Sequence, residues 1–334
     1  MAPRTATVDG DLQRLLDQAV ERTRIGVDDG KSGSPVERLR LADGQTVVVK
    51  RVRPYGDWIM RAMHDEGRAA RLWQRGILRR VPGVIDHAVL GVVPDGDGWL
   101  VVMRDVAGFL VPADHVLTRD ESRRVIGAVH ALHESFVGED LPGLTPLADR
   151  YTVLGPTLTL RERDGTDDVP KLVERGWDRF AERVAPDVAR HVLGLLDDPG
   201  ELVAALERFP QTLVHGDLKI PNLGLAPDRV VVIDWGTQTG LAPPAVEWAW
   251  YLAISAGRIG ATREDILDDV RAAEGEGHDC AALSVALLGA FVQLGWNKAL
   301  DAYEHPDPVT RARERLDLEW WVRTARGVLD AWPV

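Results

Sequence analysis

Cysteine and lysine are scarce in this sequence, and basic residues are fewer than acidic ones. Cys280 is the only cysteine among 334 residues. No disulfide can therefore form within the chain, and we expect a protein of the reducing cytoplasm. The 40 basic residues are outnumbered by 52 acidic ones, and the resulting net charge of −12 argues against a nucleic-acid-binding protein. A surface of this sign either serves solubility or favours a cationic substrate.

Long apolar runs are missing as well. The first residues, MAPRTATVDGDLQRLL, contain no apolar segment, so we expect no signal peptide. The longest uncharged run, residues 281–296, is 16 residues long. That length is short for a membrane span and predicts a buried helix in a protein without a membrane partner. The chain is long enough for two lobes, each with its own core.

One stretch, residues 213–235, concentrates polar groups between apolar ones and reads LVHGDLKIPNLGLAPDRVVVIDW. Asn222 follows Asp217 by five residues, and a turn-forming Ala-Pro-Asp precedes an apolar run that ends at Asp234. Turn residues beside short β-prone runs predict a hairpin. Such a hairpin would hold two carboxylates and one amide at one end, and oxygen ligands of this kind suit Mg²⁺.

The order H-x-D-x-x-x-x-N, followed by an aspartate after a strand, is typical of kinase-type phosphoryl transfer. With glycine at Gly216 and Ile-Asp-Trp around Asp234, the stretch resembles the aminoglycoside phosphotransferase family of small-molecule kinases. The resemblance implies an α+β, bilobal protein-kinase-like fold. It places a β-rich nucleotide-binding lobe at 1–106, a hinge at about 103–107, and a larger, mainly helical catalytic lobe at 107–334.

The resemblance also implies roles for the polar residues of this stretch. Asp217 would accept the proton of the substrate hydroxyl or orient that hydroxyl. Asn222 and Asp234 would hold Mg²⁺ against the phosphates of the nucleotide. Lys219 would reach the γ-phosphate as charge develops there, and His215 would brace the loop through backbone hydrogen bonds.

Only five lysines stand beside 35 arginines, which draws attention to Lys50 in the predicted strand 46–52. It resembles the strand-borne lysine that binds the α- and β-phosphates in kinases. We predict one helix over residues 58–73. From this helix Glu66 would orient Lys50, with Asp65 as the alternative.

A turn of small residues precedes the predicted strand 36–41. The backbone amides of Gly30, Gly33 and Ser34 either cover the nucleotide phosphates or form a plain β-turn. A P-loop is excluded, because Gly26 stands one position too close to the Gly-Lys-Ser and a strand follows where a helix should begin.

The rest of the first lobe is predicted to contain a helix at 11–24 and further strands at 87–93 and 99–103, so the residues before 107 form a small β-rich lobe. By the resemblance, Met103 lies at the back of the adenine pocket, and the backbone of Arg104 and Val106 meets the adenine edge. Helices are then predicted at 118–131, 171–184, 188–196, 200–208, 263–274, 280–303 and 309–332, and residues 140–170 stay unassigned.

Two features indicate a small acceptor. Gly216 replaces the arginine with which protein kinases dock a phosphorylated segment, and only twelve residues separate Asp234 from Glu247. Glu247 stands where the family pattern has aspartate, and we expect it to bond backbone near the catalytic loop. Acidic and aromatic residues of the last helices either bind a cationic acceptor or belong to the core: Trp296, Asp301, Glu304, Glu319, Trp320 and Trp321.

The sequence therefore predicts an ATP- or GTP-dependent, Mg²⁺-using phosphotransferase. Its acceptor would be a hydroxyl of a small molecule, such as an aminoglycoside, an amino sugar or an amino alcohol, and antibiotic resistance is one outcome of such an activity. The alternative is an inactive nucleotide-binding module with a regulatory or scaffold role. The joint presence of Lys50, Asp217, Asn222 and Asp234 favours the enzyme. The sequence does not fix an oligomeric state.

Overall fold

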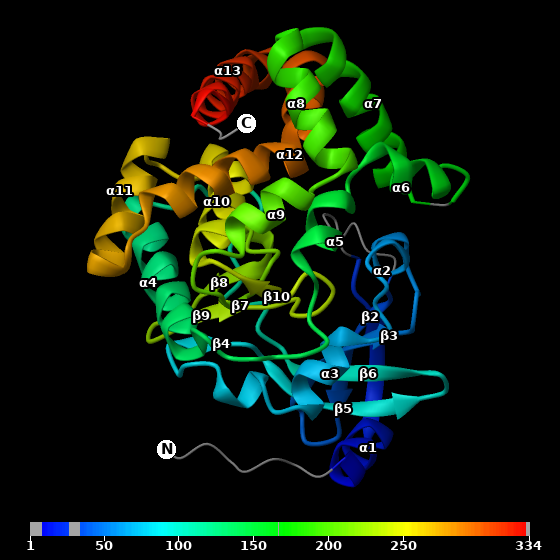
Figure 1. Cartoon of the computed structure of the whole chain (residues 1–334). Helices are drawn as coiled ribbons and strands as arrows, with labels where there is room; N and C mark the ends of the chain where they lie inside the picture. The colour runs from blue at the N-terminus through cyan, green and yellow to red at the C-terminus, as the bar shows by residue number, and fades with distance from the viewer. Residues whose placement is uncertain (1–8, 27–33, 166, 332–334) are drawn as a thin grey trace. The chain divides into compact units, whose positions relative to one another are not determined.

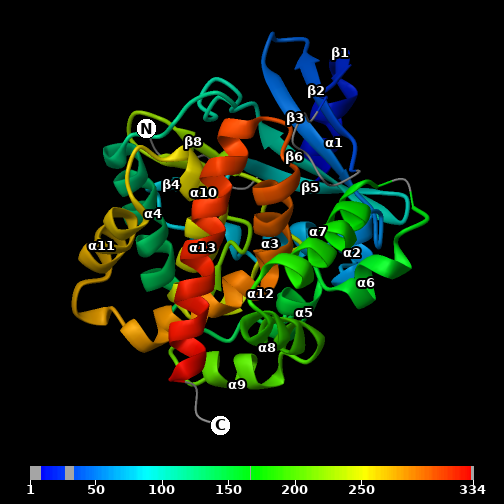
Figure 2. The same ribbon diagram turned by 90° about the horizontal axis from the view of Figure 1, so that it is seen from above.

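The structure is a computed structural model that describes residues 9–26, 34–165 and 167–331 (Figures 1 and 2). The chain forms two compact units. The first contains the residues up to Ser135 together with Asp217–Thr239 and Arg258–Gly260, and the second contains Phe136–Gly216, Gly240–Gly257 and the chain from Ala261 onward. The lobes predicted at 1–106 and 107–334 divide the chain elsewhere, and that division stays a prediction.

The first unit contains a five-stranded antiparallel sheet in the order β1-β2-β3-β6-β5. Its strands are β1 (Ala19–Arg24), β2 (Val36–Leu41), β3 (Thr46–Val52), β5 (Val89–Asp95) and β6 (Gly98–Arg104). The four strands that the sequence pattern located are confirmed to within two residues. Strand alternation buries Val47 and Val49 of β3 and places Lys50 on the opposite face of the strand.

The predicted helix at 11–24 is wrong in its second half. Helix α1 (Asp9–Asp17) ends early, and β1 pairs with β2. Leu12 and Leu16 are the buried residues of α1 and pack into the core of the sheet. The segment AVERTR that follows carries β-branched side chains, which favour a strand. Its backbone N–H and C=O groups find their hydrogen-bond partners in β2 rather than within a longer helix.

The helix predicted at 58–73 is two short helices, α2 (Trp58–Ala62) and α3 (Arg68–Gln74). The chain between them takes left-handed backbone conformations at His64, with φ of 50°, and at Gly67, with φ of 108°. An α-helix cannot continue through such residues. Asp65 and Glu66 consequently lie in a turn rather than in the middle of a helix.

The predicted hairpin is present as β8 (Leu223–Leu225) and β9 (Val230–Val232), and β4 (Ile85–Asp86) pairs with β9 in parallel. A 3₁₀ turn, η2 (Ile220–Asn222), precedes β8. Also in this unit are η1 (Leu78–Arg80) and α4 (Arg119–Phe136). The apolar residues at 213–214 belong instead to β7 (Thr212–Val214), which pairs with β10 (Gly240–Ala242) in the second unit.

The second unit is mainly helical. Its helices are α5 (Leu147–Thr152), α6 (Pro156–Arg161), α7 (Val169–Arg183), α8 (Pro186–Asp197), α9 (Gly200–Leu206), α10 (Pro244–Ser255), α11 (Arg263–Glu274), α12 (Cys280–Glu304) and α13 (Pro308–Asp330). Short 3₁₀ segments η3 (Ala256–Arg258) and η4 (Gly275–Gly277) follow α10 and α11. The helices predicted from residue 171 onward are confirmed, and α5 and α6 occupy the stretch that the pattern left unassigned.

Helix α12 forms the centre of this unit. It contacts α7, α10 and α13, and Figure 2 shows α13 alongside it. By length and composition α12 is able to cross a membrane, yet 72% of its most apolar window is buried within the protein. Trp296 and Trp321 are buried, and the ring of Trp321 stacks on Phe291 with centroids 6.1 Å apart. The prediction of a buried helix is confirmed, and these two tryptophans are core residues.

Candidate active site

The loop after β7 brings three predicted residues together. The Asn222 side-chain amide donates hydrogen bonds to the backbone carbonyl of Asp217 (2.9 Å) and to its Oδ2 (3.2 Å). The Lys219 Nζ lies 2.8 Å from the same Oδ2. Leu218 and Ile220 alternate with these polar residues and are buried. Burial of the apolar residues anchors the loop and leaves Asp217 and Lys219 together at the site.

The second carboxylate stands at the end of the hairpin. Asp234 follows β9 with a φ of 66°, which is in the left-handed region. Its Oδ1 accepts a hydrogen bond from Lys50 Nζ at 2.6 Å, although the two residues lie 184 positions apart in sequence. The backbone N–H of Ile233 donates to the Asn222 carbonyl at 2.9 Å and so ties the end of β9 to the loop that contains Asp217.

The charges of these residues are coupled. Burial lowers the pKa of Lys50, but the charge and hydrogen bond of Asp234, helped by Asp57 and Asp217, outweigh it, and the net pKa is raised. Burial likewise lowers the pKa of Lys219, but its ion pair with Asp217 outweighs that effect and the net pKa is raised. Both lysines are therefore ammonium ions at neutral pH. Two cations beside two carboxylates suit a site for phosphates and a metal ion.

Oxygen atoms are the only candidate metal ligands at this site. The described residues contain no group of three or more His, Cys, Asp or Glu side chains that could hold a metal ion. The side-chain nitrogen of Asn222 donates its hydrogen bonds to Asp217. The side-chain oxygen of Asn222 is therefore directed toward other groups. One carboxylate, from Asp234, and one amide oxygen match Mg²⁺, which takes few protein ligands and completes its shell with phosphate oxygens and water.

The predicted pairing of Lys50 with Glu66 does not form. The Glu66 side chain is 51% exposed and contacts Arg71 (2.6 Å) and the Tyr55 hydroxyl (3.1 Å). The alternative, Asp65, is buried and accepts hydrogen bonds from the backbone and from Thr237. The physical reason is the break at Gly67, because a turn does not direct these side chains as the predicted helix would.

A third carboxylate, Asp57, was not among the residues predicted for the site. It caps α2 by accepting a hydrogen bond from the Met60 amide at 2.9 Å, and it is 4% exposed. Its charge raises the pKa of Lys50. The aspartate directly before the apolar residues of a helix is a recognisable N-cap signal. That signal could have located Asp57, although not its influence on Lys50.

The predicted nucleotide contacts are placed in part. Gly30 and Gly33 lie outside the described residues, and the Ser34 hydroxyl is 3.5 Å from Asp57 Oδ2. Met103 and Ile233, the residue before Asp234, both pack on one apolar cluster, which consists of Ala88, Val106, Ala226 and Val231. The four members of this cluster are at most 8% exposed, so Met103 and Ile233 lie against a buried apolar core.

Arg104, predicted to meet the adenine edge, uses its side chain and its amide N–H within the protein. Its side chain pairs with Asp86, and its amide N–H donates to the Ala88 carbonyl at 2.9 Å. The N–H is therefore committed to the protein. An adenine contact at this residue would have to use the carbonyl oxygen.

Residues of the second unit hold the backbone immediately before Asp217. The Glu247 carboxylate is fully buried and accepts hydrogen bonds from the amides of His215 (2.6 Å) and Gly216 (3.0 Å). This contact confirms the backbone-bonding role expected for Glu247. Gly216 has a φ of 85°, a conformation that glycine adopts without strain.

Arg150, which was not among the predicted residues, binds the carbonyl side of Gly216. Its Nη1 donates to the Gly216 carbonyl at 2.7 Å, and its guanidinium lies 5.1 Å from the ring centroid of Trp250 on α10. Arg150 lies on α5, within the stretch that the sequence left unassigned, and it is 2% exposed. No periodicity distinguishes it from the other arginines, so no sequence signal was available.

The residues suggested for a cationic acceptor are largely engaged with other groups. Glu304 pairs with Arg175 and Arg179, and the Trp320 indole donates to Glu264 at 2.9 Å. Burial, followed by the charge of Glu314, raises the pKa of Asp301. Glu304 is thus neutralised by two arginines within the protein, and its suggested role in binding a cation loses support.

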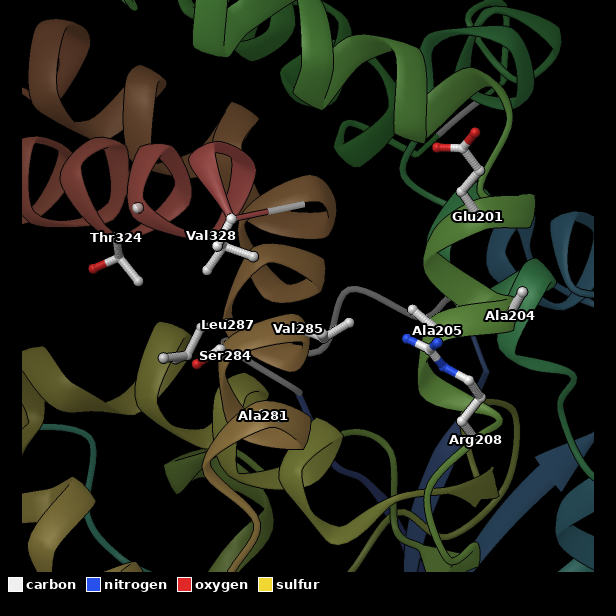
Figure 3. A pocket seen from close by; sticks show the side chains of 12 residues that line it. Glu201, Ala204, Ala205, Arg208, Ala281, Ser284, Val285, Leu287, Thr324 and Val328 are labelled. Atoms are coloured by element: carbon white, nitrogen blue, oxygen red, sulfur yellow. The ribbon is translucent and has the colours of Figure 1, made fainter. Parts of the chain in front are cut away.

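A hollow of about 840 Å³ lies among α9, α12 and α13 in the second unit (Figure 3). Its lining is mostly apolar and includes Ala205, Val285 and Val328, with Glu201 and Arg208 as the charged residues. None of the predicted catalytic, metal or nucleotide residues lines it. The residues predicted for phosphoryl transfer therefore do not line this hollow.

The chain is similar to phosphotransferases in its sequence and in its fold. The model of the phosphotransferase enzyme family matches residues 29–283. Solved structures of the same fold include an aminoglycoside phosphotransferase from Alicyclobacillus acidocaldarius, with 16% identity, a TM-score of 0.54 and coverage of 99% of this chain and 98% of that one. Another, from Streptomyces rimosus, has 19% identity, a TM-score of 0.52 and coverage of 86% and 99%.

A choline kinase from Streptococcus pneumoniae is also similar, with 12% identity, a TM-score of 0.53 and coverage of 95% of this chain and 97% of that one. No curated protein sequence matches the chain. These likenesses confirm the predicted α+β, kinase-like fold.

Proposed function

Because the chain belongs to the phosphotransferase enzyme family and is a small-molecule kinase, we propose that it transfers the γ-phosphate of ATP or GTP to a hydroxyl group of a small acceptor. The observation that carries this proposal is the pairing of Lys50 with Asp234 beside the Asp217–Lys219 pair. Phosphoryl transfer depends on positioning and charge neutralisation, and these four side chains supply both signs of charge.

Each residue has a distinct task in the proposed reaction. Asp217 orients the acceptor hydroxyl and accepts its proton, and the Asn222 amide keeps the carboxylate in place. Lys219 stabilises negative charge on the transferred group, and Lys50 binds the α- and β-phosphates. Asp234 and the Asn222 oxygen would hold Mg²⁺, which when bound neutralises phosphate oxygens.

The chain between Asp234 and Glu247 supports a small acceptor. Gly236 and Thr239 form a hydrogen-bonded turn, β10 follows, and α10 begins at Pro244. The segment is fully used by these elements, so it offers no extended stretch on which a peptide could dock. Structural neighbours named as aminoglycoside phosphotransferases and as a choline kinase support an amino-bearing acceptor, namely an aminoglycoside, an amino sugar or an amino alcohol.

The test is ADP release with aminoglycosides, amino sugars, choline and homoserine as acceptors. We expect turnover with one of them. In Asp217→Asn, kcat should fall by roughly 10²–10⁴-fold, the usual worth of a positioned general base, while ADP affinity stays unchanged. Asp228→Asn is the matched control, since Asp228 lies at the exposed turn of the hairpin that follows the loop of Asp217.

Two results would contradict the proposal. Near-parental turnover in Asp217→Asn would remove the base assignment. Tight ATP binding without turnover on any acceptor would instead favour the inactive nucleotide-binding module. For the metal assignment, Asp234→Ala should abolish the Mg²⁺ dependence of nucleotide binding, and unchanged dependence would overturn it.

A further inference from the structure

Asp234 is the only described aspartate with a positive φ, and its conformation needs an explanation. A residue other than glycine keeps such a backbone where the surrounding structure over-determines it. On the upstream side, the Ile233 amide donates to the Asn222 carbonyl at 2.9 Å. This bond fixes the chain immediately before Asp234.

The downstream side is fixed three residues later, at Thr237. Its hydroxyl donates to Asp65 Oδ2 at 2.7 Å, and its carbonyl accepts from Arg68 Nη1 at 2.7 Å. Gly236 lies against the same helix start, since a Cβ added there would be 3.1 Å from the Ala69 Cβ. The first residues of α3 therefore contact Gly236 and hydrogen-bond to Thr237 directly.

The Asp65 carboxylate, which accepts the hydrogen bond from Thr237, is itself held in place. Its Oδ1 accepts hydrogen bonds from the amides of Gly67 (2.7 Å) and Arg68 (2.6 Å), which anchors the carboxylate to the first turn of α3. Arg68 Nη1 lies 3.8 Å from Asp65 Oδ2, and both side chains are buried. Because a buried charge pair is costly to break, the position offered to the Thr237 hydroxyl is well defined.

We infer that Thr237, Asp65 and Arg68, together called the Thr237 latch, position the Asp234 carboxylate for Mg²⁺. The inference rests on the proposed function for the identity of the ion. Only Asp234, Trp235 and Gly236 lie between the two fixed points, so release of Thr237 lets Asp234 relax out of its left-handed conformation. Asp65, the alternative partner predicted for Lys50, thus acts on the metal carboxylate instead.

The experiment compares Thr237→Val, which removes the hydroxyl at nearly constant shape, with Thr237→Ser, which keeps it. Mg²⁺ is titrated into the complex of the protein with ADP, and ADP affinity is also measured without metal. We expect Thr237→Val to weaken Mg²⁺ binding about 10-fold, at the low end of what supporting partners contribute, and Thr237→Ser to stay within about twofold of the parent. Metal-free ADP affinity should not change.

Thr159→Val serves as the matched control. Thr159 is another buried threonine, bonded to the Gly155 carbonyl at 3.1 Å in the second unit, and its loss should leave Mg²⁺ affinity unchanged. Asp65→Asn is a second variant of the Thr237 latch that keeps an acceptor oxygen and loses the charge. It should weaken Mg²⁺ binding in the same direction, and its effect should not add fully to that of Thr237→Val.

The outcomes separate this inference from the proposed function. Unchanged Mg²⁺ affinity in both Thr237→Val and Asp65→Asn overturns the Thr237 latch alone. An equal loss of metal-free ADP affinity also overturns it, because that result indicates general loosening. A parent protein that binds no ADP with or without Mg²⁺ overturns both the proposed function and the inference.

Discussion

Replacement of Glu247 by aspartate should damage this protein, although aspartate is the residue that the family pattern has at this position. The Glu247 carboxylate reaches the amides of His215 and Gly216 at 2.6 and 3.0 Å. Loss of one methylene withdraws the carboxylate by about 1.5 Å, a single C–C bond length. Its helix cannot follow, because Trp248 and Ala249 beside it are buried and packed. Both distances would then exceed the hydrogen-bonding range.

The magnitude follows from the bonds lost. Each hydrogen bond to a charged group contributes about 1.5–3 kcal/mol, so loss of two lowers the free energy of unfolding by about 3 kcal/mol or more. Glu247→Gln keeps one oxygen acceptor and should cost less, about 2 kcal/mol. Because Asp217 directly follows Gly216, a shift of about 1 Å in the loop should lower kcat by about 10²-fold.

The assay combines denaturant unfolding, ADP binding and phosphotransfer on the same variants. We expect lower stability and lower kcat with little change in ADP affinity, because the nucleotide-site residues lie in the first unit. Glu201→Asp, at an exposed position of α9, controls for the loss of a methylene. Parental stability and kcat in Glu247→Asp would refute the reasoning that the length of this side chain matters.

Three further changes test the charges of the site. Glu66→Gln should leave ADP affinity within about twofold of the parent, since an exposed ion pair contributes little; a large loss would restore Glu66 as the partner of Lys50. The raised pKa of Lys50 keeps its ammonium charged below pH 10.5, the ordinary lysine value. The contribution of the Lys50–Asp234 ion pair to the free energy of unfolding is therefore lost only at higher pH. Asp234→Asn should lower the pKa of Lys50, because the effect of burial then dominates. Acylation of Lys50 at pH 8, measured by mass spectrometry relative to that of exposed Lys171, should therefore become faster. An unchanged acylation rate would contradict this expectation. Lys219→Ala should lower kcat by about 10-fold or more with unchanged ADP affinity, and unaltered kcat would remove Lys219 from the reaction.

Features set by neighbouring residues could be predicted from the sequence. The spacing of Asp217 and Asn222 is local to one loop, and the structure joins their side chains as expected. The turn at 226–229 and the strand before Asp234 follow from turn chemistry and β-branched residues. Lys50 was recognisable because it stands in a β-prone run and lysine is rare in this chain.

Features set by distant residues could not be predicted in this way. The segment 19–24 shows helical periodicity, yet it becomes β1 because β2 offers an edge to pair with. The helix break at Gly67 depends on packing. A glycine is also tolerated within a right-handed helix, so the presence of Gly67 in the sequence did not by itself predict a break. Arg150 acts through one backbone carbonyl, and any arginine in a loop-rich stretch would look the same.

The adjacent acids Asp65 and Glu66 show why the partner of Lys50 was misassigned. Both precede the same helix, and sequence order alone cannot choose between them. Thr237 and Arg68 make the choice by drawing Asp65 inward, which leaves Glu66 facing solvent. Lys50 then pairs with Asp234, the proposed ligand of Mg²⁺. Mg²⁺ would compete with the Lys50 ammonium for that carboxylate, so we expect Mg²⁺ binding to weaken the Lys50–Asp234 pair and to make Lys50 available to the phosphates.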